Sequence, residues 1–249
     1  SSAGNYRRFL LEGYGLRDLA TMVSNQAPNP NYAEGSVFFV RSDRKDLDSI
    51  ASLKDKSVSA NYPFAFSGWQ IAAGELMKRG FDPDHFFSKM DFLGHGAAPV
   101  IDAVMSGKTD AGIVRACVLE NAGLIKSGKV KVLEPKETTD FPCEVCTRLY
   151  PNWTLSTTPN TPPEISRKVT AAVLEIKPLQ NNLHWSVATD FTPIDDLFKQ
   201  LQIGPYEYLR HFSIKRFIEA YWQYFVFALI FIIGLILHGI RSEYLVNKR

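Results

Sequence analysis

Apolar residues follow two different spacings along the chain, and each spacing predicts a kind of element. SVFFVRS at 36–42 is a short apolar run, which is typical of a buried strand. In SGWQIAAGELMKRG the apolar residues recur at helical spacing, Ser67 is placed to cap the helix and Gly80 to end it. Further strands are predicted at 57–62, 91–95, 110–118 and 129–135. This alternation of strands and helices indicates an α/β fold.

Start and stop signals predict three more helices. One begins after His95 and is stopped by Gly107. Thr-Pro-Pro-Glu forms a capping box with proline at the first helical position, which predicts a helix over 161–177. A second threonine–proline pair predicts a helix over 192–201.

The stretch 221–240, YWQYFVFALIFIIGLILHGI, contains no formally charged residue. About 20 apolar residues span a bilayer, so we predict a transmembrane helix here. Aromatic residues stand at its first end and basic residues follow its last end, which predicts a cytoplasmic C-terminus and an external preceding portion. A buried helix of a soluble protein is the alternative. The chain starts without Met or a signal peptide and stops soon after this stretch, which predicts a fragment shortened at both ends.

Composition narrows the classes of function. The 249 residues are 45% hydrophobic and 22% charged, which is typical of a globular protein and argues against disorder. The formal net charge is only +2, so we expect no nucleic acid as a partner. No catalytic constellation is readable, and we predict no enzymatic activity for this portion and no cofactor.

The three cysteines allow more than one state. Cys143 and Cys146 form a lone CxxC without a second pair or a histidine cluster, so we predict no metal site. A disulfide between these two is one alternative. If the segment is a strand, however, the side chains of Cys143 and Cys146 point to opposite faces of the sheet. Buried, unpaired thiols are the other. Cys117 has no assigned role.

Three glycine-rich or basic features predict a small-anion site. Ser67 and Gly68 lie at one helix start, and His95 and Gly96 lie at another. Free N–H groups and the positive end of the helix dipole favour an anion at such places. Arg115, in the strand that follows, adds a planar guanidinium suited to an oxyanion. Trp69 completes the candidate set, although its helical spacing equally suits the core.

Each candidate also has a purely structural interpretation. Ser67 and His95 are both plausible helix caps. Arg115 has Glu120 and Asp102 as candidate ion-pair partners nearby in the sequence. The functional interpretation is favoured because all three features fall at equivalent junctions of strand and helix, where ligands bind in open α/β sheets.

The segments GKTDAGIVRACVLE and SGWQIAAGELMKRGFDP resemble the phosphonate-type family of type 2 periplasmic substrate-binding proteins. More narrowly, VRACVLE, TRLYPNW and LQIGPYEYLR, followed at once by the apolar stretch, resemble the sensory region of tetrathionate-sensor-like histidine kinases. The resemblance covers nearly the whole chain. Each signature is short, but their order and spacing agree with the family.

The resemblance implies a two-lobed, hinged periplasmic-binding-protein clamp with an incomplete first lobe, followed by one transmembrane helix. The hinge is expected near 38–41 and 143–147. The implied divisions are a remnant of the first lobe at 1–42, the second lobe at 43–140, a return to the first lobe at 141–211, a juxtamembrane helix at 212–220, the transmembrane helix at 221–240 and the start of a cytoplasmic region at 241–249.

The resemblance also adds two site residues and one departure. SSAGNYRRFL is similar to a helix start of the family's first lobe, which makes Ser2 and Tyr6 candidates for ligand contact. Ala65 stands where the family typically has a serine before Phe66, Ser67 and Gly68. One hydroxyl donor for a phosphate-type ligand is therefore missing, which argues against phosphonate and suits a weakly hydrated anion such as a polythionate.

Together these features predict the ligand-sensing domain and membrane anchor of a bacterial two-component sensor in the inner membrane. The expected partners are tetrathionate or a related sulfur anion, the lipid bilayer through 221–240, a second copy of the chain in a homodimer, a missing kinase region and a response regulator. The alternative is a tethered substrate-binding protein of an anion or phosphonate ABC importer. Two further rivals are a cyclase or phosphatase as the missing cytoplasmic part, and redox sensing by Cys143 and Cys146. The sequence leaves the identity of the anion open.

Overall fold

The computed structural model describes residues 1–209, 221–224, 226–227, 229 and 231–238. Residues Ser1–Tyr206 form one compact unit, and Glu207–Arg249 form a second. The predicted juxtamembrane helix at 212–220 and cytoplasmic start at 241–249 lie outside the described residues, and the predicted span at 221–240 lies partly outside them. Within the described residues, no helix combines the length and the apolar character that crossing a membrane requires.

A mixed five-stranded sheet forms the centre of one half of the first unit. Its strand order is β4-β3-β5-β2-β6. β3 runs parallel to both β4 and β5, whereas β2 runs antiparallel to β5 and β6. The strands are β2 (Ser36–Arg41), β3 (Ser57–Ala60), β4 (Lys89–Phe92), β5 (Ala111–Arg115) and β6 (Val130–Val132). Four of them were expected with longer bounds, whereas β4 was predicted at 91–95 and lies two to three residues earlier.

Helices cover this sheet and close a large apolar core. They are the short 3-10 turn η1 (Ala51–Leu53), the π-helical turn η2 (Phe66–Gln70), which continues into α2 (Ile71–Lys78), and the helices α3 (Ala98–Met105) and α4 (Val118–Asn121). Phe38, Phe39 and Ile113 from the strands pack with Leu76 of α2 and Val104 of α3. A side chain at Gly112 would collide with Phe39 and Val104, so this strand position requires glycine.

Two predicted helix starts are displaced by a few residues. The helix predicted from Ser67 begins at Phe66, and Ala65 occupies the N-cap position without a side-chain hydrogen bond. Ser67 therefore lies in the first turn and is not the cap. The helix expected directly after His95 begins at Ala98. Gly80, with φ of +83°, does follow the end of α2 as predicted.

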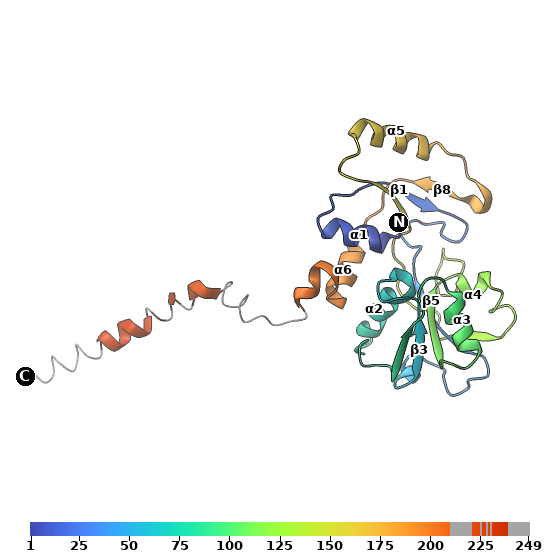
Figure 1. Ribbon diagram of the computed structural model, residues 1–249, viewed down its shortest axis with the longest axis horizontal. Coiled ribbons are helices and arrows are strands. Elements are labelled where there is room, and N and C mark those ends of the chain that lie inside the picture. Colours follow the sequence, from blue (N-terminus) through green and yellow to red (C-terminus); the bar gives the residue numbers. More distant parts are fainter. Residues whose placement is uncertain (210–220, 225, 228, 230, 239–249) are drawn as a thin grey trace, which may run out of the picture. The chain divides into compact units, whose positions relative to one another are not determined.

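A second, three-stranded antiparallel sheet has the order β7-β1-β8. Its strands are β1 (Arg17–Val23), β7 (Thr154–Thr157) and β8 (His184–Ser186). The surrounding elements are α1 (Ala3–Leu11), α5 (Pro163–Leu174) and the short turn η3 (Gln180–Asn182). Figure 1 shows α1, α5, β1 and β8 gathered in one group and α2, α3, α4, β3 and β5 in the other.

The chain passes between the two sheets along a pair of hydrogen-bonded segments. The N–H of Glu34 donates to the carbonyl of Tyr150 at 2.9 Å, and the N–H of Tyr150 donates back at 2.8 Å. Further along the same two segments, the N–H of Cys146 donates to the carbonyl of Ser36 at 3.0 Å. Residues 38–41, where we expected a hinge, lie inside β2 of the larger sheet. The position at which the clamp bends stays a prediction.

A smaller apolar core joins α1, η2, α2 and α6 (Thr192–Leu201). Phe66 makes edge-on contacts with both Tyr150 and Phe198, with ring centroids 5.7 and 6.4 Å apart. A side chain at Gly74 would collide with Leu197, so glycine lets α6 approach α2 closely. The helix predicted at 192–201 is confirmed, and the 3-10 turn η4 (Gly204–Leu209) follows it.

The cysteines pair in a way that the CxxC pattern did not indicate. Cys117 and Cys143 form a disulfide with a Cα–Cα distance of 5.1 Å. Cys146 is a buried thiol that donates to the carbonyl of Leu133 at 3.0 Å. Burial raises the pKa of this thiol to about 12, so it is a poor nucleophile. The expected alternatives, a Cys143–Cys146 bridge or only unpaired thiols, are both wrong, and the thiol environment argues against redox sensing by this pair.

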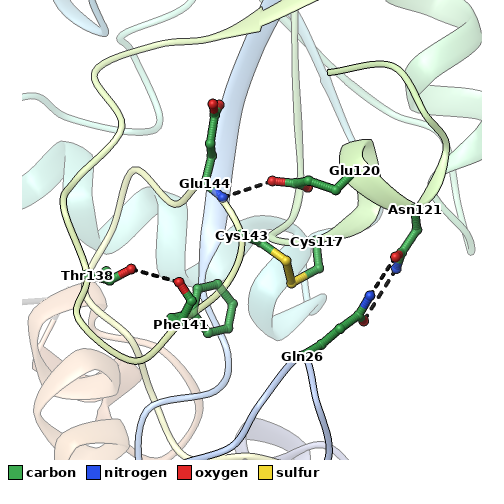
Figure 2. Close-up of a disulfide and its surroundings, with 8 residues drawn as sticks. All are labelled: Gln26, Cys117, Glu120, Asn121, Thr138, Phe141, Cys143 and Glu144. Atoms are coloured by element: carbon green, nitrogen blue, oxygen red, sulfur yellow. Dashed lines mark hydrogen bonds between the residues drawn. A yellow bond between two sulfur atoms is a disulfide. The ribbon is translucent and has the colours of Figure 1, made fainter. Parts of the chain in front are cut away.

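Figure 2 shows how the disulfide ties the end of β5 to the segment that leads back to the second sheet. Cys117 has φ of +70° immediately before α4. The N–H of Glu144 donates to the carboxylate of Glu120 at 2.8 Å, beside the disulfide. Gln26 and Asn121 exchange amide hydrogen bonds on the other side of it.

Asp110 predicts an acid-sensitive contribution to stability. Burial raises the pKa of its carboxyl, but hydrogen bonds from Ser57 and Arg44 outweigh this and hold the pKa at about 2. The unfolded value is about 3.9. Because the folded pKa is depressed, this stabilisation is present above about pH 4 and is lost as pH falls toward 2. The urea concentration at the unfolding midpoint is therefore expected to decrease less between about pH 4 and pH 2 in Asp110→Asn than in the wild type.

Asp140→Asn, at an exposed position, removes the same charge and is the control. Equal acid dependence in the wild type and in both variants would contradict the assignment to Asp110.

Candidate functional site

A cavity lies at the carboxyl ends of β3 and β5. Its volume of about 560 Å³ is within the range typical of small-ligand sites. Its walls come from the start of α1, the crossing segment at 34, the residues after β3, the start of η2, the loop before α3, and the end of β5. The lining residues are Ser1, Ser2, Asn5, Glu34, Asn61, Tyr62, Ala65, Phe66, Ser67, Gly68, His95, Gly96, Ala97, Arg115, Val118 and Trp153.

Parallel strands explain why residues far apart in the sequence meet here. β4, β3 and β5 are adjacent and parallel, so their carboxyl ends share one edge of the sheet. Asn61 directly follows β3, His95 follows β4, and Arg115 ends β5. Ligands bind at such edges in open α/β sheets because loops and helix starts gather there.

Ser67 and Gly68 contribute the first turn of a helix. The N–H groups of a first turn have no partner within the helix, and they carry the positive end of its dipole. The hydroxyl of Ser36 donates to the carbonyl of Ser67 at 2.7 Å and so holds this turn against β2. A side chain at Gly68 would meet the amide oxygen of Asn61 at 2.5 Å, so glycine is required for the close approach of Asn61.

The loop that carries His95 is anchored from the neighbouring strand. The side-chain amide of Asn61 donates to the carbonyl of Gly96 at 2.6 Å. The rings of Tyr62 and His95 lie 4.6 Å apart. Gly94 and Gly96 have φ of +87° and +84°, a conformation that glycine adopts without strain. His95 is therefore positioned by a tight loop beside the cavity and does not cap α3.

Arg115 pairs with a residue that local sequence did not suggest. Its Nη2 lies 3.2 Å from Oε1 of Glu34, whose side chain is only 1% exposed. Of the partners expected, Glu120 instead accepts a hydrogen bond from the backbone of Glu144. The Arg115 side chain is 37% exposed, so part of its guanidinium remains accessible from the cavity.

Six predicted site residues line the cavity and two do not. Ser2, Ser67, Gly68, His95, Gly96 and Arg115 are in its wall. Tyr6 is buried, and its hydroxyl donates to Asp18 at 3.0 Å. Burial, together with Asp18, raises the pKa of Tyr6 to about 12. Trp69 is partly buried and packs against both apolar cores, with its ring edge-on to Phe92 at a centroid distance of 5.5 Å.

Sequence reasoning missed several polar residues of the wall, among them Asn61 and Glu34. Asn61 lies near the end of the strand predicted at 57–62, so the rule that selected Arg115 would also have selected it. Glu34 carries no local signal, because it belongs to the crossing segment and reaches Arg115 only through the antiparallel pairing of β2 with β5. In the part of the chain that is described, no group of histidine, cysteine or acidic side chains is placed to hold a metal ion.

Solved structures of other proteins share this fold. A Xanthomonas citri protein superimposes with a TM-score of 0.58 in its chloride-bound structure and 0.57 in its ATP-bound structure, both at 14% identity. The matches cover 81% of this chain and 75% and 76% of those chains. A binding-protein component of a Pseudomonas aeruginosa ABC phosphonate transporter gives 0.58 at 18% identity, covering 80% and 67%. PhnD1 of Prochlorococcus marinus, in complex with methylphosphonate, gives 0.54 at 16% identity, covering 74% and 72%.

At 14–18% identity these structures show only that the fold is shared. The family is shown by a match of the sequence to a family model. No curated protein matches the chain. Residues 10–196 match the family described as the periplasmic substrate-binding protein of phosphonate ABC transporters. Members of this family bind ligands outside the cytoplasm and are not enzymes. Since the match covers most of the chain, this protein belongs to the phosphonate-type family of periplasmic substrate-binding proteins.

Proposed function

We propose that the chain binds a small oxyanion in the cavity beside Arg115 and delivers it to an ABC importer. The observation that carries this proposal is the convergence of Arg115, the first turn at Ser67 and the His95 loop at the carboxyl ends of the parallel strands β3, β4 and β5. The family supports importer delivery more directly than the two-component sensor predicted from the sequence. A small anion is the partner common to both roles.

The proposed chemistry is electrostatic recognition. The guanidinium of Arg115 offers a planar set of donors that matches two oxygens of an oxyanion. Backbone N–H groups at Ser67 and Gly68 and the hydroxyl of Ser67 supply further donors in the cavity wall. Ser67 is buried apart from 8% of its surface, so these interactions are only weakly screened by water.

The cavity draws its wall from both groups of elements, which supports a clamp mechanism. Asn5 belongs to α1 and Ser2 caps it, while Arg115 and His95 belong to the larger sheet and its loops. An anion that contacts both groups stabilises the closed arrangement by its extra affinity for that arrangement. In this cap the hydroxyl of Ser2 accepts from the N–H of Asn5 at 3.4 Å.

A second candidate function is extracytoplasmic sensing of a sulfur oxyanion such as tetrathionate. The observation that favours it is the uncharged apolar stretch at 221–240, which suits a membrane anchor placed after the binding domain. In that role the homodimer, the kinase region and the response regulator would be the further partners.

A ligand-induced change in thermal unfolding tests the binding proposal. The full chain is heated with tetrathionate, thiosulfate, sulfate, phosphate or methylphosphonate. An anion at about 100 times its Kd is expected to stabilise by about 2.7 kcal/mol and to raise Tm by roughly 5–10 °C. No shift with any of these anions would reject the proposed site.

Cells lacking the gene separate the two roles. If the chain serves an importer, uptake of the labelled anion is expected to fall when the chain is absent. Normal uptake together with a lost transcriptional response to the anion would instead support the sensor.

A further inference from the structure

The carboxylate of Glu34 is held in the cavity wall without hydrogen bonds. The residue is 1% exposed, and neither Oε1 nor Oε2 has a hydrogen-bond partner among the described residues. Its backbone is fixed on both sides by the pairing with Tyr150, so the side chain is presented from a rigid segment. Buried polar groups are nearly always hydrogen-bonded, and an exception in a ligand cavity needs a reason.

Arg115 accounts for the charge of Glu34 but not for its lone pairs. The two side chains approach to 3.2 Å, which makes an ion pair. The alignment is nevertheless outside that of a hydrogen bond, and both carboxylate oxygens remain unsatisfied. A carboxylate that pairs with a guanidinium accepts hydrogen bonds and donates none. The missing partner must therefore be a donor.

We propose that Glu34 accepts a hydrogen bond from the bound anion and so selects oxyanions that carry an O–H or N–H group. This inference rests on the proposed function of the cavity. Monoprotonated phosphonate or phosphate has such a donor. Sulfate, thiosulfate and tetrathionate have none near neutral pH, so their oxygens would face the lone pairs of Glu34.

Repulsion makes this selection stronger than the hydrogen bond alone. A site built around a donor on its ligand rejects an analogue that lacks the donor, because the buried acceptor is then left unpaired. Arg115 supplies attraction to every oxyanion, and Glu34 supplies the discrimination among them. The inference thus deepens the binding proposal and disfavours the sulfur anions of the sensor interpretation.

Methylphosphonate and methanesulfonate form a matched pair for the test. They have the same shape, and at a mildly acidic pH both are monoanions, but only the phosphonate carries an O–H. Isothermal titration of the full chain is expected to give at least about tenfold tighter binding of methylphosphonate. Phosphate against sulfate is the second pair and is expected to show the same order.

Glu34→Gln tests whether this residue makes the distinction. The amide offers a donor to either anion, so the preference for methylphosphonate is expected to shrink to within about threefold, mainly through tighter binding of methanesulfonate. Glu164→Gln removes the same charge from an exposed position of α5 and is expected to leave the preference unchanged.

Each outcome decides the matter. Equal affinity of the wild type for both members of each pair would overturn the inference and leave the proposed function intact. A wild-type preference that Glu34→Gln does not narrow, with both affinities falling together, would also overturn it and make Glu34 only a positioning residue for Arg115. No binding of any of the four anions would overturn the proposed function and this inference with it. The wild-type comparison needs no variant, so it stands even if Glu34→Gln fails to fold.

Discussion

Arg115→Ala is expected to weaken binding of the preferred anion by at least about 100-fold, which corresponds to about 3 kcal/mol. The substitution removes the cationic side chain at the carboxyl end of β5 that faces the cavity. Arg115→Lys keeps the charge but loses the planar fork, so an intermediate loss is expected. Isothermal titration measures both. Arg41→Ala, which removes a guanidinium paired with Asp43 elsewhere on the same sheet, is the matched control.

Loss of Arg115 also leaves Glu34 buried without its counter-charge, so stability and binding must be separated. Breaking a buried ion pair from one side costs about 3–5 kcal/mol, and the partial exposure of Arg115 reduces the expected cost to about 2 kcal/mol. The double variant Glu34→Gln, Arg115→Ala removes both charges and is expected to recover most of this stability without recovering binding. A folded Arg115→Ala protein that binds within about threefold of the wild type would contradict the assigned role.

Replacing Cys117 and Cys143 together by serine is expected to lower the free energy of unfolding by about 3.5 kcal/mol. The disulfide closes a loop with a sequence separation of 26, and the loss follows from the greater conformational entropy of the uncrosslinked unfolded chain. For a unit of this size the loss corresponds to a fall in Tm of roughly 10 °C. Thermal and urea unfolding of the two proteins measure it.

Reducing agent supplies the internal control for the disulfide. Dithiothreitol is expected to destabilise the wild type and to leave the double serine variant unchanged. Cys146→Ala, which alters the buried thiol and leaves the disulfide intact, should retain the response to reductant. Two free thiols titrated in addition to Cys146 in the oxidised wild-type protein would show that the bridge is absent. A formed disulfide agrees with an extracytoplasmic location.

Patterns within single elements were enough for the five-stranded sheet and for several helices, but they predicted none of the strands β1, β7 and β8 of the second sheet. The strands β2, β3, β5 and β6 follow from short apolar runs, and α5 and α6 follow from threonine–proline start signals. These features act through neighbouring residues of the same element, so they can be read along the chain. The same local logic placed Ser67, His95 and Arg115 at strand–helix junctions, and all three line the cavity.

Three details could not be read locally because their causes lie between distant segments. Cys143 meets Cys117 because the segment after β6 returns past the end of β5, whereas the CxxC spacing drew attention to the wrong pair. Tyr6 and Trp69 have side chains that suit either a ligand or a core, and in the folded chain Tyr6 is buried in the smaller core while Trp69 packs against both cores.

Local sequence is thus enough to predict the α/β class of the fold, the strand–helix junctions that line the cavity, and Arg115 at one of them. The reason is that helix starts and strand ends are marked by nearby residues. Tertiary structure alone decides which charges meet. Glu34 and Arg115 become partners only because β2 pairs antiparallel with β5, which brings the residue before one strand beside the last residue of the other. A register of hydrogen bonds between strands leaves no mark on the intervening sequence, so the acceptor that we expect to select the ligand appears only in the folded chain.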